Sequence, residues 1–406
     1  MYPNLHHALL DLFGWELPAL KLINSFGLFV ALAFLAAHGL LGRELKRHAD
    51  LGNFTPQISK EVVGRGPNPI DLAIQALMGF VLGWKVLYLV VNAGTLFQGS
   101  GLPQAHLFST EGNVMWGILG ALALAGWRYW EVKRAQLPEP KLVERQVRPE
   151  ELVGGVTAAA AIGGIGGAKL FHLLEYPDEF VAFIQQPSLN AFLGGLTIYG
   201  GLIVGGLAVY VFARRNKMNF LRLADATSPG LLLAYGIGRM GCQISGDGDW
   251  GIPNPFPKPG WLSWAPDWVW AYAYPNNVNG VYGPRSAGYT GKLIDPNVHV
   301  WPSFEGYGTY LDPAVFPTPI YETTAAVIGF AFLWSMRTRW QTPGKMFAAY
   351  LMFNGFERFW IEKIRVNTTF EWLGITMTQA ELISVCTMLA GIALWVWTSR
   401  NSNRQA

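Results

Sequence analysis

Residues 235–251 read YGIGRMGCQISGDGDWG, and the rest of the chain is best interpreted from this stretch outward. It places Arg239, and then Asp247 and Asp249, at the end of an otherwise apolar segment. An ionisable side chain in a membrane segment is costly unless it faces a cavity or a partner, so it indicates a functional site. The six glycines of the stretch let the backbone approach a ligand or another helix closely.

The composition around this stretch is that of an integral membrane protein. Of the 406 residues, 51% are hydrophobic and only 14% are charged, whereas soluble domains carry about 25% charged residues. The two cysteines, Cys242 and Cys386, lie far apart in apolar segments, so neither a disulfide framework nor a thiol metal site is indicated. Residues 1–19 contain no Lys or Arg, so we expect mature protein rather than a cleavable signal.

Apolar runs of about 20 residues, long enough to cross a bilayer as helices, predict an all-α, polytopic bundle of about nine transmembrane helices. They lie near 20–42, 71–96, 112–131, 152–176, 194–213, 223–246, 319–337, 344–365 and 380–399. Lys and Arg gather in alternate connections, at 43–65, 133–148, 214–222, 337–345 and 400–404, whereas 97–111, 176–193 and 366–378 have none. The positive-inside rule then predicts an outer N-terminus and a cytoplasmic C-terminus.

The long connection at 252–318 is rich in Trp, Tyr, Pro and Gly and lacks enough long apolar runs to cross the bilayer. We expect it to form an outer cap. Its aromatic residues fit either a belt at the lipid headgroups or a surface that grips substrate, and the sequence leaves both interpretations open.

A polar stripe is predicted on the helix that contains NGFERFWIEKIR. Asn354, Arg358, Glu362 and Arg365 follow i, i+4, i+8, i+11 spacing and therefore share one face. An Arg358–Glu362 ion pair could serve packing alone.

Two further cations, Arg239 and Lys169, occupy other apolar segments. One anionic headgroup between them and the stripe would explain all of these charges through contacts to phosphate. Lys85, alone in its segment, is better explained as a packing or snorkelling residue. His172 and the other histidines lack the spacing of metal ligands.

Five motifs in order along the chain resemble those of the phosphatidylglycerol–prolipoprotein diacylglyceryl transferases of bacterial membranes. The motifs are GAKLFHLL at 167–174, GGLTIYGGLIVGG at 194–206, DATSPGLLLAYGIGRMG at 225–241, PTPIYE at 317–322 and NGFERFWIEKIR at 354–365. The family's arginines and glutamate are matched by Arg239, Arg358, Arg365 and Glu362. Tyr199 replaces a family His, Asn354 a family Tyr, and Cys242, Gln243, Ser245 and Asp247 replace the Asn-Phe-x-Asn-x-Glu run, with one extra residue before Gly251.

The resemblance implies a seven-helix core in which one helical hairpin and an enlarged head are insertions. Five parts are then expected: an outer segment, first helix and cytoplasmic loop at 1–70, an inserted transmembrane hairpin at 71–131, core helices at 132–251, an aromatic periplasmic head at 252–318, and C-terminal core helices at 319–406. The protein is expected in the bacterial cytoplasmic membrane, with its site facing the outer leaflet.

The chemistry implied by the resemblance moves a diacylglyceryl group from phosphatidylglycerol to the lipobox cysteine thiol of a prolipoprotein signal peptide, with release of glycerol phosphate. The expected catalytic residues are Arg239, Arg358, Asp247, Tyr199 and Glu362. The expected substrate-binding residues are Lys169, Gly200, Gly201, Gly241, Asn354, Arg365, Tyr321 and Glu322. We expect no metal and no other cofactor, and membrane lipids but no nucleic acid as partners.

The implied reaction makes two physical demands. Arginines aimed at the leaving phosphate stabilise its developing charge in a water-poor site. The acceptor thiol, with an ordinary pKa of about 8.5, needs a base or a positive field, which Tyr199, Asp247 or Asp249 near the arginines could help to provide. We favour activation by the arginine field, with Asp247 as the second candidate.

Other functions remain open at this stage. A transporter or channel could also place Arg, Lys and Asp in its spans, although the paired repeat halves typical of transporters are not visible in the sequence. A related transferase with another lipid or acceptor, or a lipid-binding scaffold without activity, would equally explain the replaced His and Asn residues.

Overall fold

The computed structural model describes residues 1–54, 57–97, 106, 109–185, 195, 197–279, 288–372 and 374–402. Within these residues helices predominate, and a long helical segment occupies each predicted apolar range. They are α2 (Ser25–Asp50), α3 (Pro69–Val81) continued by η2 (Leu82–Leu87) and α4 (Tyr88–Val91), α6 (Val114–Arg134), α7 (Val153–Glu175), α10 (Ile198–Arg215), α11 (Phe220–Ser245), α12 (Thr318–Met336), α13 (Lys345–Glu362) and α14 (Gln379–Ser402).

Five helical segments in the described part are long and apolar enough to cross a membrane. They are Ser25–Asp50, Pro69–Val91, Pro149–Glu175, Ile198–Arg215 and Gln379–Asn401. The remaining long helices carry more polar or charged residues. Among them are α11, which contains Arg239, and α13, which contains Arg358. The chain is a helical, multi-pass membrane protein.

The expected all-α class is too narrow, because the described residues also form three two-stranded antiparallel sheets. These pair β1 (Gln57–Val63) with β2 (Lys141–Val147), β3 (Thr290–Leu293) with β4 (Thr309–Asp312), and β5 (Thr369–Trp372) with β6 (Ile375–Thr378). All six strands are short and lie in connections between helices, where sequence gives a weak strand signal. The remaining short helices are α1 (Leu5–Phe13), η1 (Pro18–Leu22), α5 (Ala93–Leu96), η4 (Pro149–Leu152), α8 (Pro177–Gln185), η5 (Gly260–Leu262) and η6 (Asp267–Val269).

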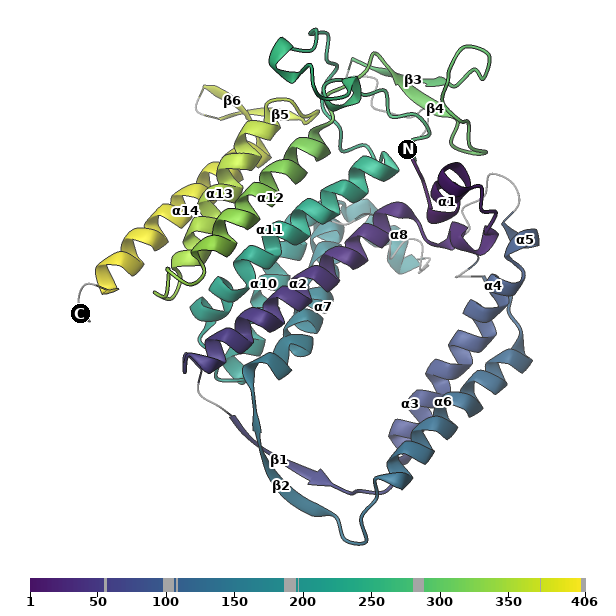
Figure 1. The fold of residues 1–406 in the computed structure, drawn as a ribbon, viewed down its shortest axis with the longest axis vertical. Helices are drawn as coiled ribbons and strands as arrows, with labels where there is room; N and C mark the ends of the chain where they lie inside the picture. Colours follow the sequence, from purple (N-terminus) through teal and green to yellow (C-terminus); the bar gives the residue numbers. More distant parts are fainter. Residues whose placement is uncertain are drawn as a thin grey trace.

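Helix α11 lies at the centre of the main bundle, between α2 and α12, while α7 packs on α10 and α13 on α14 (Figure 1). Close helix contact depends on glycine where α7 meets α10. A Cβ at Gly167 would lie 2.4 Å from the carbonyl oxygen of Gly200, and a Cβ at Gly200 would lie 2.4 Å from that of Gly167. Small residues of this kind allow membrane helices to approach closely.

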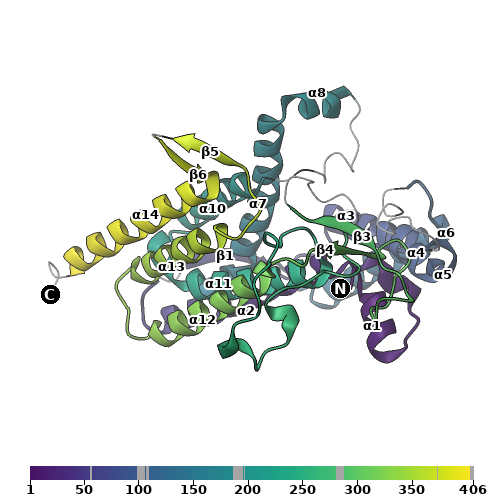
Figure 2. The same ribbon diagram turned by 90° about the horizontal axis from the view of Figure 1, so that it is seen from above.

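Helices α3 and α6 form a hairpin that stands apart from the main bundle in two views (Figures 1 and 2). A Cβ at Gly79 would lie 2.1 Å from the carbonyl oxygen of Gly120, so its two helices pack closely on each other. At one end the β1–β2 ribbon joins the hairpin to the bundle. At the other end Lys21 Nζ donates a hydrogen bond to Phe97 O at 2.7 Å.

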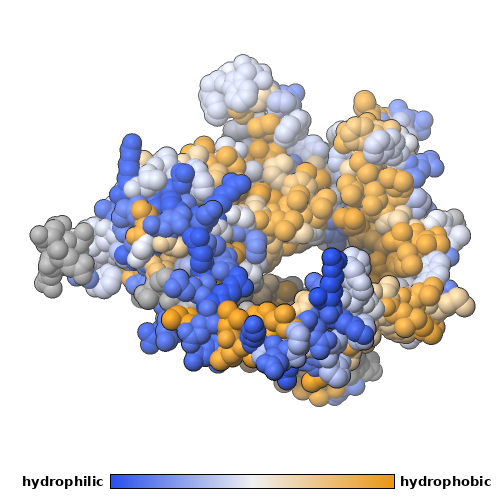
Figure 3. All heavy atoms as spheres, turned by 60° about the horizontal axis from the view of Figure 1, so that its bottom comes forward, coloured by the Kyte–Doolittle hydropathy of each residue, from blue (hydrophilic) through white to orange (hydrophobic). Residues whose placement is uncertain are grey.

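The described residues of the Lys- and Arg-rich connections lie at the end of the bundle that carries β1 and β2, and residues 252–279 and 288–316 lie at the opposite end (Figure 1). Viewed from the β1–β2 end, hydrophilic side chains gather over these connections, while hydrophobic ones cover the helices (Figure 3). An opening between the hairpin and the main bundle is visible in the same view.

The head shares a hydrophobic core with Trp250 of the loop after α11, made of Trp250, Tyr274, Tyr289, Leu311 and Val315. Its hydrogen bonds to the bundle include two near α12 and α13. The Tyr321 hydroxyl, in the first turn of α12, donates to Val269 O at 2.9 Å, and the backbone N–H of Ile252 donates to Ile364 O at 2.9 Å. The loop that follows α11 is therefore held between the head and the end of α13.

Candidate functional site

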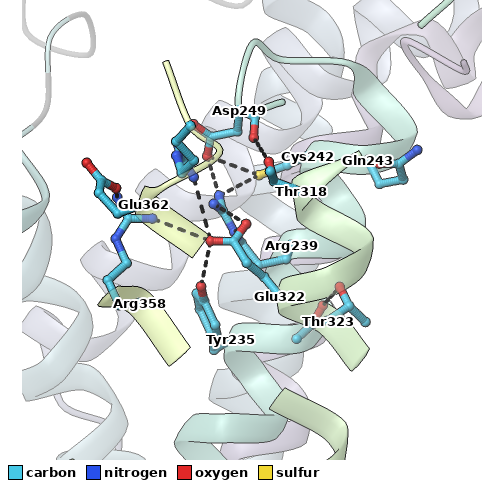
Figure 4. Close-up of polar contacts among 12 residues, drawn as sticks. Tyr235, Arg239, Cys242, Gln243, Asp249, Thr318, Glu322, Thr323, Arg358 and Glu362 are labelled. Carbon is cyan, nitrogen blue, oxygen red and sulfur yellow. Dashed lines mark hydrogen bonds and ion pairs between the residues drawn. The ribbon is translucent and has the colours of Figure 1, made fainter. Parts of the chain in front are cut away.

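The site is centred on Glu322, which is fully buried. Its Oε2 accepts from Arg239 Nε at 2.6 Å, and its Oε1 accepts from the Tyr235 hydroxyl at 2.9 Å (Figure 4). Arg358 Nη1 and Arg365 Nη1 lie 3.4 and 3.6 Å from the same Oε1. A buried carboxylate is stable only when paired and hydrogen-bonded, and here it joins α11, α12, α13 and the segment after α13.

A second carboxylate, Asp249, lies outside Glu322 in the loop that follows α11. It forms an ion pair with Arg239 Nη1 and accepts from Arg365 Nη2 at 2.6 Å. Its backbone is held because Thr318 Oγ1 donates to Asp249 O at 2.8 Å. Gly248, with φ +103°, provides the sharp turn directly before it.

The charges of this pairing set the protonation state of Asp249. Burial alone would raise its pKa, but the guanidinium groups of Arg239 and Arg365 outweigh burial and lower the pKa from 3.8 to about 2. Asp249 is 38% exposed, whereas the two arginine side chains are each 11% exposed. An anionic group thus covers two largely buried cations from the more open side.

Asp247 lies beside these ion pairs, where its Oδ1 accepts from the backbone N–H of Asp249 at 3.3 Å. Burial, and then the negative charge of Asp249, raise the pKa of Asp247. The two carboxyl groups of this loop therefore differ in proton affinity, a pattern that separates acid and base roles in many enzymes.

The Cys242 thiol is also buried here, 3.5 Å from Arg239 Nη1 and 3.7 Å from Asp249 Oδ2. Ligand atoms of Cys242, Asp247 and Asp249 lie within 4.8 Å of one another and could approach one cation. Arg239 and Arg365 already neutralise Asp249, so the protein's own charges account for the arrangement.

The predicted polar stripe reaches this site, although α13 carries only Asn354, Arg358 and Glu362 of it, because the helix ends at Glu362 and Arg365 lies in the segment that follows. Arg358 Nη2 lies 3.0 Å from Glu362 Oε2, and Glu362 Oε1 accepts from Asn367 Nδ2 at 2.6 Å. Because Arg358 also contacts Glu322, the Arg358–Glu362 pair is not an isolated packing pair within one helix. Asn354 is half-buried one turn before Arg358.

These six residues form what we call the arginine–carboxylate cluster: Arg239, Arg358, Arg365, Glu322, Asp249 and Glu362. Within the described residues it joins three guanidinium groups to three carboxylates. Tyr199, on α10, lies within electrostatic range of Arg358 and Glu362. The cluster is therefore the common neighbourhood of most residues that the sequence singled out.

Other expected site residues have structural contacts of their own. Gly200 packs α10 on α7, Gly201 lies opposite the Gly164 carbonyl, and a Cβ at Gly241 would lie 2.9 Å from Phe29 Cβ of α2. These glycines act in helix packing, so a direct substrate contact is not needed to explain them. Tyr321 holds the head, as described above.

Two lysines differ in their surroundings. Lys169 is buried on α7. Lys85 donates to Ser109 O, Ser109 Oγ and Glu111 O at 2.6–2.8 Å. Lys85 is thus a packing residue of the hairpin, as the sequence indicated.

Sequence reasoning preferred Asp247 to Asp249, yet Asp249 is the carboxylate that contacts the arginines. The extra residue before Gly251 obscured which of the two aspartates corresponds to the acidic position of the motif. From the sequence, no role was assigned to Tyr235, although this residue belongs to the stretch 235–251. Its i, i+4 spacing to Arg239 could have indicated that both side chains share one face of α11. Glu357 was missed because it lies off the polar stripe.

Comparison with known proteins agrees with the motifs. The profile described as Prolipoprotein diacylglyceryl transferase matches residues 114–397. The chain is similar to the phosphatidylglycerol–prolipoprotein diacylglyceryl transferase of Corynebacterium glutamicum, with 29% identity over 235 residues that cover 57% of this chain and 65% of that protein.

Two proteins of the same name show similar levels of identity. That of Cutibacterium acnes is 28% identical over 220 residues, 52% of this chain and 59% of that protein, and that of Gloeobacter violaceus is 27% identical over 268 residues, 64% and 82%. The chain thus spans somewhat less than two thirds of the Corynebacterium and Cutibacterium relatives. The profile match contains every residue of the arginine–carboxylate cluster, and the chain belongs to the prolipoprotein diacylglyceryl transferase family.

Proposed function

We propose that this protein transfers the diacylglyceryl group of phosphatidylglycerol to the lipobox cysteine thiol of a prolipoprotein. The observation that carries the proposal is the convergence of Arg239, Arg358 and Arg365 on Glu322, in a chain of this family. In the transfer, the thiol sulfur forms a bond to the glyceryl carbon as the carbon–oxygen bond to phosphate breaks. The thiol proton passes to a base, and glycerol phosphate leaves.

The lipid phosphate is proposed to bind at Arg239 and Arg365, from the side that Asp249 covers. A phosphate can share or replace the Asp249 contacts, because planar guanidinium groups hold phosphate and carboxylate oxygens in the same way. Glu322 keeps the guanidinium groups oriented from beneath, so little reorganisation is needed as the leaving phosphate gains charge. Arg358 would add positive potential from α13.

The acceptor thiol requires loss of its proton. Asp247 is the proposed proton acceptor, because its pKa is raised while that of Asp249 is held at about 2. Tyr199 is proposed to position substrate beside Arg358 and Glu362 rather than to act as the base. Lys169, Asn354 and the glycines of α10 would shape the adjoining lipid site.

We further propose nine membrane spans with an outer N-terminus, a cytoplasmic C-terminus and a periplasmic head at 252–318. The separation of the Lys- and Arg-rich connections from the head supports this orientation. The arginine–carboxylate cluster then faces the outer leaflet of the cytoplasmic membrane, where a secreted precursor presents its cysteine. The 71–131 hairpin would add two spans at the edge of the core.

The test is a transfer reaction with purified protein in a non-ionic detergent. Phosphatidylglycerol and a lipobox peptide are the substrates, and phosphatidylethanolamine replaces the donor in a parallel reaction. The expected product is a thioether-linked diacylglyceryl peptide, identified by mass, with phosphatidylglycerol as the preferred donor. A peptide with Ser in place of the lipobox Cys is the matched control.

The replacements at Tyr199 and Cys242 favour one alternative, a related transferase with another donor or acceptor. Product with phosphatidylethanolamine but not with phosphatidylglycerol would support that alternative. Binding of phosphatidylglycerol without any transfer would instead identify a lipid-binding scaffold.

A further inference from the structure

A further acidic side chain, Glu357, lies in α13 directly before Arg358 and has no part in the chemistry described so far. It is 6% exposed, and neither of its carboxyl oxygens has a hydrogen-bond partner within the described residues. This distinguishes it from Glu322, Asp249 and Glu362, each of which is paired with arginine. A buried carboxylate anion without a donor is far more costly than the neutral acid.

The surroundings of Glu357 increase the cost of a charge there. It lies within electrostatic range of Glu322 on α12 and of Arg239 and Tyr235 on α11. Arg358, on the same helix, and Arg365, just after that helix, are also within electrostatic range. The hydrogen bonds and closest ion pairs of these arginines go to the other carboxylates. Helix α14 also packs on α13, and its Glu381 pairs with Lys363 at 2.5 Å.

The charge balance of the arginine–carboxylate cluster depends on this side chain. Three guanidinium groups offset three carboxylates, so the cluster is neutral while Glu357 is protonated. Loss of that proton would add a negative charge that no guanidinium group of the cluster offsets, next to the place proposed for an anionic phosphate. Like charges in such a partly buried site repel by more than about 1 kcal/mol at separations of up to about 10 Å.

We propose that Glu357 is a positioning residue that stays protonated while phosphatidylglycerol binds, so that the arginine–carboxylate cluster remains neutral and accepts the anionic headgroup. The inference rests on the proposed function, because it names the lipid that the cluster binds. It assigns Glu357 a role in substrate affinity that acts through Arg239, Arg358 and Arg365 rather than through contact with the lipid.

The experiment measures the Kd of short-chain phosphatidylglycerol for purified protein in a non-ionic detergent, without acceptor peptide, from about pH 6 to about pH 9. This range spans the values at which buried glutamates are known to titrate. The charge of the lipid phosphate is constant over it, and omitting the peptide removes the titration of the acceptor thiol. We expect the Kd of the wild-type protein to rise about tenfold or more toward alkaline pH.

Glu357→Gln is the decisive variant, because glutamine has the shape of the neutral acid and cannot ionise. We expect this variant to bind with the low-pH affinity of the wild-type protein over the whole range. Asp267→Asn is the matched control, since it makes the same carboxyl-to-amide change at a side chain in the head that is 94% exposed. The control should keep the pH dependence of the wild-type protein.

Three results would overturn the inference. They are a wild-type Kd that does not change with pH, a Glu357→Gln protein with unchanged pH dependence, and an Asp267→Asn protein that has lost it. A wild-type Kd that does not change with pH overturns the inference even where Glu357→Gln fails to fold. Absence of phosphatidylglycerol binding at every pH would overturn the proposed function as well, whereas pH-independent binding overturns this inference alone.

Discussion

Arg239 donates from Nε to Glu322 Oε2 at 2.6 Å, and the carboxylate that receives this hydrogen bond is completely buried. The pair joins α11 to α12 at the level where the head is attached. Arg358 and Arg365 approach the same carboxylate. Glu322 therefore organises three cations that would otherwise repel one another, and the proposed phosphate site depends on it.

Replacing Glu322 with Gln should destabilise the protein by about 3–5 kcal/mol, because buried arginines then lose their counter-charge. Transfer activity should fall with it. Thermal unfolding in detergent, read by tryptophan fluorescence, measures the first effect. A Glu322→Gln protein with wild-type stability and turnover would show that Glu322 does not hold the arginines.

Acidification should destabilise the site through Asp249. Its pKa is about 2 in the folded protein, against the ordinary value of 3.8 that applies to the unfolded chain. Its contribution to stability is therefore complete above about pH 4 and is lost as the pH falls toward 2. The exposed fraction of Asp249 reduces this contribution to about 1 kcal/mol. The difference in unfolding free energy between wild-type and Asp249→Asn proteins should shrink over this pH range. A difference that stays constant from pH 5 to 2 would contradict the ion-pair assignment.

Tyr199→Phe and Asp247→Asn separate the two proposed roles in proton transfer. Loss of the Tyr199 hydroxyl should reduce the rate by no more than about tenfold, the scale of one hydrogen bond. Loss of the base at Asp247 should cost about a hundredfold or more. Single-turnover rates with saturating lipid measure both. A thousandfold loss in folded Tyr199→Phe protein that binds lipid normally would make the tyrosinate the base.

The proposed orientation predicts which sites a membrane-impermeant thiol reagent reaches. In a background with Cys386 replaced by Ala, a cysteine at Asp178 of α8 should react from outside intact spheroplasts. A cysteine at Lys141 of β2 should react only after the membrane is opened. The reverse pattern would place the arginine–carboxylate cluster at the cytoplasmic face and remove the proposed access of secreted precursors.

The positions of the long helices could be predicted from sequence, because each requires a continuous apolar run of sufficient length. Arg239, Arg358 and Arg365 could also be singled out, since charges in apolar segments are rare and conspicuous. Their common partner was not evident from helix periodicity, because Glu322 lies on another helix and tertiary packing alone brings it to the arginines.

The parts that escaped prediction depend on local geometry in loops and on exact side-chain direction. The choice between Asp247 and Asp249 follows from the turn at Gly248, and a residue count cannot resolve it. Glu357 and Arg358 are neighbours in sequence, yet the Glu357 carboxyl has no hydrogen-bond partner among the described residues whereas Arg358 lies in the cluster. The β1–β2 ribbon pairs strands more than 70 residues apart in sequence, as Lys60 with Glu144, which no local pattern reveals.

The most direct test of the central claim is the transfer rate of Arg239→Ala and Arg239→Lys proteins beside the wild type, with thioether peptide and glycerol phosphate both measured. The wild-type protein should form the two products in equal amounts. Arg239→Ala should lose at least about a hundredfold in rate, as in the removal of an oxyanion-stabilising donor, and Arg239→Lys should restore little of it. A folded Arg239→Ala protein with near-normal formation of both products would contradict the account.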